Sequence, residues 1–348
     1  MRFVQRWNVV VLVFLSTFLL VRGGRAEVVP GSDSITAIFE GVEGEIIGFN
    51  EQHNELVFYK LLGNSLKQHA TVSVQGAVSQ VVVDKDGYLV ASGAGKKDRQ
   101  APIRIYRIPK ARERATLIYK KQTPRTQVVG LKTCGGKIWL DFFNSKYFTS
   151  IGYLKPIDNG QFDFFETLSI RMGSSFDCVG ETVIIGRSYG DIQGADGDLI
   201  LVENGKQTLL PSYRGVRGIR ILSDDSIIIG DGWHSNYGKI AQGRISLLSR
   251  HKGEERFHLE ILARSTSNYN FTKFMPIEAQ SPSYVLALGS KDVGLVSLAA
   301  KDSFVSVYKQ KNSNTLMDAA VVKVAGGVAT IAILDGQLSV QKIAIPKR

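Results

Sequence analysis

Proline is scarce in this sequence, with 9 residues among 348, whereas glycine is frequent at 35. A low proline content argues against a proline-rich linker protein, and many glycines are typical of a chain with many tight turns. After residue 26, no stretch approaches the roughly 20 apolar residues that a membrane-spanning helix needs. No later segment keeps apolar residues at three-and-four spacing over about ten positions, which is the pattern of an amphipathic helix. We therefore expect neither helices nor a transmembrane segment in the body of the protein.

Only two cysteines are present, Cys134 and Cys178. Two cysteines with no histidine nearby are a poor zinc ligand set, and we expect neither a metal ion nor a cofactor. Both cysteines fall just after the first strand of neighbouring repeats. Export would permit a disulfide, so the alternatives are a bridge between adjacent turns and two partly buried free thiols.

The first 26 residues show the three parts of a secretory signal peptide. Arg2 and Arg6 give a basic start, an apolar run extends from Val9 to Val21, and Gly24-Arg25-Ala26 supplies small residues for signal peptidase. The apolar run is about 13 residues long, which is too short to span a bilayer and argues against an uncleaved anchor. We expect a signal peptide over 1–26, one domain over 27–348, and a periplasmic or extracellular protein.

The chain carries a formal net charge of +11. A basic exported protein can be attracted to an anionic envelope surface, to polysaccharides or to acidic proteins. The lysines and arginines are nevertheless scattered, and their densest run, residues 109–114, resembles a solvated edge of a sheet. We expect no nucleic-acid partner.

The chain repeats one unit seven times. Each unit has an apolar second strand, and these begin at Glu45, Tyr88, Lys137, Thr182, Ser226, Tyr284 and Val328. A spacing of about 45 residues is the size of one four-stranded propeller blade. First strands precede them, for example Thr126 to Leu131. Near-continuous apolar runs such as Ile227-Ile228-Ile229 indicate sheets that are covered on both faces.

With these repeats, the chain resembles exported seven-bladed β-propeller proteins. It lacks the Trp-Asp and Gly-His signatures of WD40 repeats, the kelch pattern and the tryptophan-docking pattern of quinoprotein dehydrogenases, so no narrower family is implied. The resemblance implies an all-β fold of seven four-stranded antiparallel blades. The seventh unit lacks an outermost strand, and we expect the N-terminal segment from Glu27 to Val29 to supply it and close the ring, because an open ring leaves two unprotected edges. The alternatives are a six-bladed ring and two separate β-sandwiches.

Candidate binding residues gather in two neighbouring connections between second and third strands. In a propeller these connections share a face with the crossovers between blades, and binding sites usually occupy that face. The candidates are Arg187, Tyr189 and Asp191 in the fourth unit, and Asp231, Trp233, His234, Asn236 and Tyr237 in the fifth.

These residue types permit several functions. Aromatic side chains with Arg and Asp suit recognition of a protein or glycan partner. His234 as a general base, oriented by Asp191 or Asp231, would suit hydrolysis of a small ester, lactone or glycan, although no serine or cysteine lies in a nucleophile elbow. A metal site with one histidine is weakly supported, and a fourth alternative is that the polar residues only stabilise long loops. We expect a non-catalytic binding protein with no catalytic residue assigned, and a propeller hydrolase is the alternative.

Overall fold

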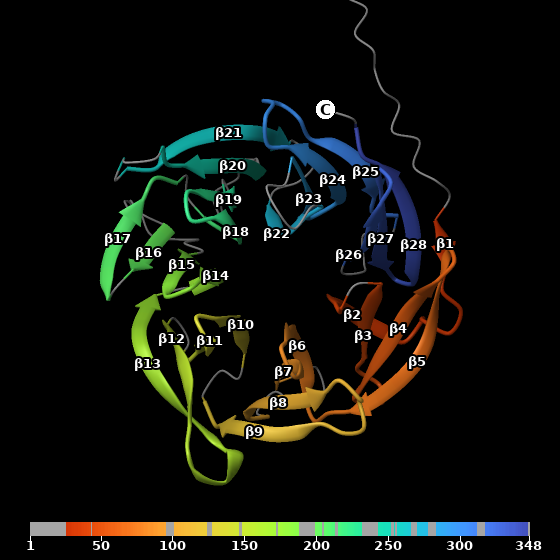
Figure 1. Ribbon diagram of the computed structural model, residues 1–348, viewed down its shortest axis with the longest axis vertical. Helices are drawn as coiled ribbons and strands as arrows, with labels where there is room; N and C mark the ends of the chain where they lie inside the picture. The colour runs from red at the N-terminus through yellow and green to blue at the C-terminus, as the bar shows by residue number, and fades with distance from the viewer. Residues whose placement is uncertain are drawn as a thin grey trace, which may run out of the picture.

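A computed structural model describes residues 26–42, 44–94, 101–123, 127–145, 148–171, 173–187, 199–203, 205–212, 215–231, 243–251, 254, 256–265, 270–277, 283–311 and 317–346. They form seven four-stranded antiparallel sheets arranged as blades around a central axis (Figure 1). The prediction of an all-β, seven-bladed propeller is confirmed, and a six-bladed ring and a pair of sandwiches are excluded. The described part of the chain has one helical turn, η1 (Asp158–Gly160).

Within each blade the strands follow one another from the axis outward. The innermost strands, in blade order, are β2 (Ile35–Glu40), β6 (Ala77–Asp84), β10 (Val128–Cys134), β14 (Gly173–Val179), β18 (Gly218–Ser223), β22 (Phe271–Pro276) and β26 (Met317–Ala325). The second strands are β3 (Glu45–Asn50), β7 (Gly87–Gly93), β11 (Lys137–Phe143), β15 (Thr182–Arg187), β19 (Ser226–Asp231), β23 (Tyr284–Gly289) and β27 (Val328–Asp335).

The outer half of each blade is built in the same way. The third strands are β4 (Glu55–Leu62), β8 (Ile103–Pro109), β12 (Phe148–Pro156), β16 (Leu199–Glu203), β20 (Gly243–Ser249), β24 (Asp292–Ser297) and β28 (Leu338–Ala344). The outermost strands are β5 (Ser65–Ser73), β9 (Thr116–Lys121), β13 (Phe162–Arg171), β17 (Lys206–Leu210), β21 (His258–Ser265), β25 (Val305–Lys309) and, in blade 7, β1 (Glu27–Val28).

The N-terminal strand closes the ring, as predicted. β1 pairs antiparallel with β28, with Glu27 opposite Val340. Beyond the strand, the Val29 amide donates to the Leu338 carbonyl at 2.8 Å. The buried Ser32 hydroxyl donates to the Val29 carbonyl at 2.7 Å and accepts from the Leu338 amide at 3.1 Å. Blade 7 is therefore built from both ends of the described chain.

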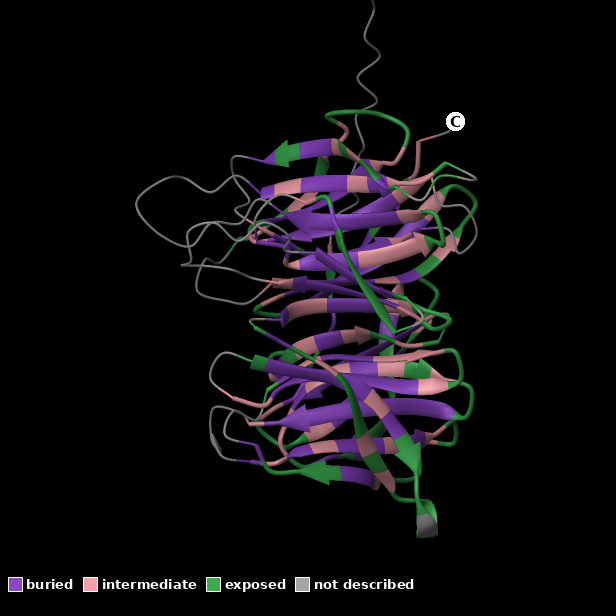
Figure 2. Ribbon diagram, turned by 90° about the vertical axis from the view of Figure 1, so that its left-hand side faces the viewer, coloured by how far each residue is buried: buried purple, intermediate pink, exposed green. Residues whose placement is uncertain are grey.

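The core lies between the blades rather than inside any one of them. Successive side chains of a second strand point to opposite neighbours, because strand side chains alternate. In blade 1, Ile46 packs with Ala332 and Leu334 of blade 7, whereas Ile47 packs with Tyr88 of blade 2. Buried residues therefore run along the strands throughout the stack of blades (Figure 2). Among the described residues, no helix is both long and apolar enough to cross a membrane.

The alternation of strand directions gives the ring two distinct faces. The loop face carries the connections between second and third strands and the crossovers between blades. The turn face carries the connections between first and second strands and between third and fourth strands. Since the inner strands all run from the loop face to the turn face, they surround the axis in parallel.

Candidate functional site

Two of the predicted binding residues lie in the described part of the chain. Arg187 is the last residue of β15 and Asp231 is the last residue of β19, so both lie on the loop face in adjacent blades. The others, Tyr189, Asp191, Trp233, His234, Asn236 and Tyr237, lie outside the described residues. Their grouping on this face stays a prediction.

Backbone hydrogen bonds join the strand ends at Arg187 and Asp231 to the crossover residues Val216 and Arg217. We call this hydrogen-bonded group the base of the two connections. The crossover into blade 5 is tied to both strands, since the Val216 amide donates to the Arg187 carbonyl at 3.1 Å and the Arg217 amide donates to the Gly230 carbonyl at 2.8 Å. The Ser174 hydroxyl, on the inner strand of blade 4, donates to the Val216 carbonyl at 2.5 Å. Blades 4 and 5 are thereby joined directly beneath the two connections.

Blade 6 also packs closely against this base. A Cβ atom at Gly230 would lie 2.2 Å from the Phe271 carbonyl oxygen, so no larger residue fits there without a backbone shift. Asp231 is 1% exposed, and its Oδ1 accepts a hydrogen bond from the Ser246 hydroxyl at 3.0 Å. The Asp231 carboxylate therefore lies inside the blade, at the base of the connection, rather than on its surface.

The connections on the loop face differ in length. Residues 188–198 join β15 to β16, and residues 232–242 join β19 to β20. In blades 6 and 7 the corresponding connections are only residues 290–291 and 336–337. The two longest connections between second and third strands thus leave from adjacent blades.

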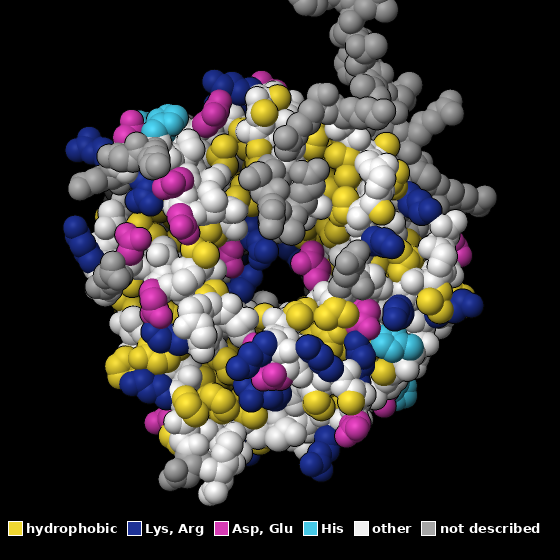
Figure 3. Space-filling model, viewed as in Figure 1, with side chains coloured by type: hydrophobic (Ala, Val, Ile, Leu, Met, Phe, Trp, Pro, Cys, Tyr) yellow, Lys and Arg dark blue, Asp and Glu magenta, His cyan; other side chains and the backbone are white. Residues whose placement is uncertain are grey.

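A second candidate site, an axial channel, was missed by the sequence reasoning. A cavity of about 560 Å³ is lined by the inner strands of all seven blades. Near the turn face it adjoins a cavity of about 400 Å³, and the charged residues that the two cavities share are Glu40, Lys132 and Arg220. Figure 3 shows the hollow at the axis, with Lys and Arg side chains on the wall nearest β18 and β22. Among the described residues, the charged ones that line the two cavities are Lys132, Arg217, Arg220, Lys273, Glu40, Asp177 and Asp318.

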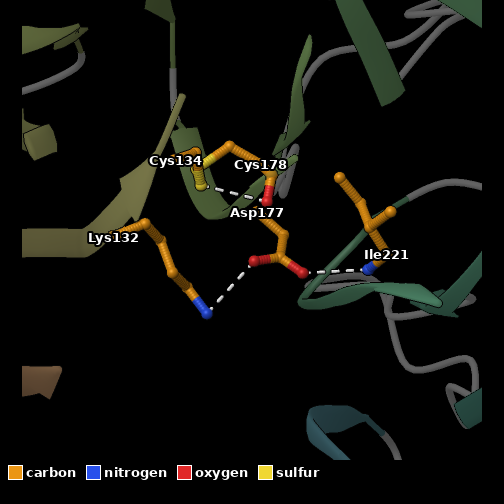
Figure 4. The surroundings of a disulfide bond; sticks show 5 residues. All are labelled: Lys132, Cys134, Asp177, Cys178 and Ile221. Atoms are coloured by element: carbon orange, nitrogen blue, oxygen red, sulfur yellow. Dashed lines mark hydrogen bonds and ion pairs between the residues drawn. A yellow bond between two sulfur atoms is a disulfide. The ribbon is translucent and has the colours of Figure 1, made fainter. Parts of the chain in front are cut away.

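Two ion pairs in the channel join neighbouring blades. Lys132 Nζ lies 3.1 Å from Asp177 Oδ1, and the Ile221 amide donates to Asp177 Oδ2 at 2.9 Å (Figure 4). One carboxylate thus connects the inner strands of blades 3, 4 and 5. Parallel inner strands of different blades do not hydrogen-bond to one another as a sheet, so this carboxylate supplies a contact that their backbones lack.

A second carboxylate makes the equivalent connection across blades 6, 7 and 1. Lys273 Nζ lies 3.2 Å from Asp318 Oδ1 and donates to the Ala319 carbonyl at 2.7 Å. The Ile38 amide donates to Asp318 Oδ2 at 3.3 Å. These contacts include the boundary between the last and first blades, where the ring closes.

Three of the channel charges could have been found in the sequence by aligning the repeats with one another. Lys132, Asp177 and Arg220 occupy equivalent positions in three consecutive inner strands, opposite Trp139, Ile184 and Ile228 of the second strands. Charged residues at one repeat position in three neighbouring units indicate a shared polar environment. In a closed ring that environment is the axis.

A disulfide joins Cys134 of β10 to Cys178 of β14, with the two Cα atoms 6.0 Å apart. It links the inner strands of blades 3 and 4, next to Asp177 (Figure 4). The expected end of the first strand of blade 3 at Leu131 was wrong, because Lys132, Thr133 and Cys134 continue the pairing with β11. The cysteines are therefore strand residues. Within the described ranges, no three His, Cys, Asp or Glu side chains gather as metal ligands.

The sequence matches no protein-family profile and no curated protein. Solved structures are similar in fold. Virginiamycin B lyase from Staphylococcus aureus has a TM-score of 0.61 at 14% identity, over 92% of this chain and 99% of that chain. The N-terminal domain of Nup159 has a TM-score of 0.53 at 11% identity, over 89% and 90% of the two chains.

The AfRom2 CNH domain is also similar, with a TM-score of 0.52 at 12% identity, over 94% of this chain and 97% of that chain. Identities this low indicate a shared fold and carry no activity from one protein to another. The closed ring of seven four-stranded sheets and its similarity to these solved structures establish the chain as a seven-bladed β-propeller.

Proposed function

We propose that the protein is exported after removal of residues 1–26 and binds a protein or glycan partner through the connections of blades 4 and 5 on its loop face, without catalysing a reaction. The observation that carries this proposal is the pairing of the two longest connections, 188–198 and 232–242, on adjacent blades with one hydrogen-bonded base. Long connections on a rigid scaffold are the usual location of binding residues in such folds.

The residue types in these connections suit recognition. Trp233 and Tyr237 supply large, rigid contact area, and residues of this type dominate binding energy at interfaces. Among similar structures, Nup159 provides a precedent, since one structure contains it together with Dbp5 and Gle1 from S. cerevisiae. The basic net charge of the chain also favours a partner or envelope surface that is anionic.

Site-specific photo-crosslinking tests the proposal. A photoreactive amino acid placed at Trp233 should yield a discrete adduct in the native envelope or secretome. The same amino acid at Leu209, which is 61% exposed on the outer strand β17, is the matched control and should not yield that adduct. Equal labelling from the two positions would contradict a partner at the loop face.

Two substitutions separate recognition from hydrolysis. Trp233→Ala should weaken capture of the crosslinked partner, whereas His234→Ala should leave that capture intact. If His234→Ala instead abolishes turnover of an ester, lactone or glycan by the purified protein, the hydrolase alternative replaces this proposal.

A further inference from the structure

Two arginines from one blade reach the axial channel. Arg217 directly precedes β18 and Arg220 lies within it, and both line the cavity of about 560 Å³. Arg220 also lines the adjoining cavity of about 400 Å³ near the turn face. Positive charge therefore extends along the channel wall of blade 5.

The other cations of the channel already have carboxylate partners. Lys132 is paired with Asp177, and Lys273 is paired with Asp318. Each of these aspartates also accepts a backbone amide with its second oxygen. Glu40, at the turn-face end of β2, is exposed, and within the part of the chain that the structure describes it accepts one long hydrogen bond, from the Val321 amide at 3.5 Å.

Arg220 differs from these lysines. Among the described residues, no carboxylate forms an ion pair with it, and its Nε atom is buried without a hydrogen-bond partner. A half-buried guanidinium that has lost part of its hydration without gaining an anionic partner is costly. Among the described lining residues, Lys132 and Lys273 are each paired with an aspartate, so Arg220 adds positive charge that neither ion pair balances.

We infer that the axial channel binds a small molecule through an oxyanion group, a phosphate or a carboxylate, with Arg220 as its principal ligand. The planar guanidinium presents donors in a fork that matches both oxyanions. The cavity of about 560 Å³ lies within the range of small-molecule sites, about 300–1,000 Å³. Burial also lowers the pKa of Arg217, which lines the same wall. An anion in the channel would replace the missing hydration.

Calorimetric titration of the intact mature protein with inorganic phosphate, and separately with succinate, tests the inference. Chloride keeps the ionic strength constant, so that general screening is the same throughout. Saturable binding of one equivalent of either anion is the expected result, and the tighter of the two identifies the oxyanion class. No saturable binding of either anion would overturn the inference.

Arg220→Gln should weaken binding about tenfold or more, since a hydrogen bond to a charged group contributes about 1.5–3 kcal/mol. Arg264→Gln is the matched control, because Arg264 is exposed on the outer strand β21 of the same blade and its loss changes the net charge equally. Binding to this control should be unchanged. Equal weakening in both variants would reduce the effect to net charge and refute a site at Arg220.

Crystals of the unaltered protein soaked in tungstate, a phosphate analogue, provide a readout that does not depend on how a variant folds. An anomalous peak within hydrogen-bond distance of the Arg220 guanidinium supports the inference, and ordered tungstate only outside the channel contradicts it. None of these measurements involves the loop face. Failure to bind an anion therefore leaves the proposed recognition function unaffected, and failure of the crosslinking experiment leaves the anion site unaffected.

Discussion

Arg112 Nη2 donates to both carboxylate oxygens of Glu45, at 2.6 and 2.7 Å. Glu45 begins the second strand of blade 1, whereas Arg112 lies in the connection between the third and outer strands of blade 2, so the pair joins the two blades on the turn face. Glu45 is 5% exposed and also accepts the Tyr88 hydroxyl at 2.6 Å. The guanidinium carbon lies 5.2 Å from the centre of the Phe58 ring. The two charges are thus paired within a largely apolar interface.

Replacing Arg112 should destabilise the protein strongly. Arg112→Met leaves the buried Glu45 carboxylate with the Tyr88 hydroxyl and with His69 Nε2 at 3.4 Å, a histidine whose pKa burial lowers. The permanent counter-ion is then lost, and breaking a buried pair in this way costs about 3–5 kcal/mol. Urea unfolding measures the loss. Lys137→Met is the control, because it removes an ion pair with Glu181, whose side chain is 56% exposed, and such pairs contribute about 0–1 kcal/mol. If Arg112→Met lowers the free energy of unfolding as little as Lys137→Met does, the Glu45–Arg112 pair adds little stability.

Asp141 should make the stability depend on pH. It lies in the second strand of blade 3, is fully buried, and has no well-formed hydrogen bond to either oxygen among the described residues. Burial raises its pKa from 3.8 to about 8, and the nearby Thr149 hydroxyl offsets only part of this rise. Between these two pH values the folded state retains a proton that the unfolded state has released. Stability contributed by this group is therefore complete below about pH 4 and declines as the pH rises to about 8.

Asp141→Asn should remove that decline. The free energy of unfolding of the variant should exceed that of the parent protein by an amount that grows between pH 5 and pH 8, at a limiting rate of about 1.4 kcal/mol per pH unit. Unfolding curves at a series of pH values check this. Thr330→Val, another buried polar residue of a second strand but without a titrating group, should leave the pH profile unchanged. Parallel profiles for the parent and Asp141→Asn would contradict the buried-proton explanation.

Removing the disulfide should destabilise the ring at the boundary between blades 3 and 4. Cys134 and Cys178 are 44 residues apart, and closing a loop of this length in the unfolded chain accounts for about 2–4 kcal/mol. The double variant Cys134→Ser/Cys178→Ser should lose about this amount in urea unfolding under oxidising conditions. Under reducing conditions the parent protein should approach the stability of the variant. A parent protein unaffected by a strong thiol reductant would contradict the bridge.

The blades were predictable because their second strands are doubly buried. A strand with apolar neighbours on both faces reads as a near-continuous apolar run, and the predicted starts at Glu45, Lys137, Thr182 and Ser226 are the observed starts of β3, β11, β15 and β19. Ring closure was predictable because the seventh unit lacked one strand and a short extended segment, beginning at Glu27, preceded the first unit.

The channel charges and the Glu45–Arg112 pair were not predictable in the same way. Their partners lie in different blades, and which residues meet across a blade boundary depends on how the sheets twist and pack. Arg220 differs from the two channel lysines because Lys132 and Lys273 form ion pairs with aspartates, and those pairs are visible only in the folded structure. On the loop face, the sequence located the long connections, but the burial of Asp231 beneath one of them follows from its place at the end of β19.

Pairing of β1 with β28 should prevent the edge of blade 7 from pairing with strands of other chains. Deleting residues 27–30 exposes the edge of β28, whose unpaired amides and carbonyls would form a template for another strand. It also removes the buried Val29 side chain, which contributes about 1.5–3 kcal/mol. We expect the truncated protein to unfold at lower urea concentration and to form oligomers whose proportion rises with protein concentration in size-exclusion chromatography. Val28→Ala, which alters a side chain that is 51% exposed but keeps the backbone pairing, should elute at the same position as the parent protein. A truncated protein that elutes like the parent protein and keeps its unfolding midpoint would show that blade 7 holds the ring closed with three strands.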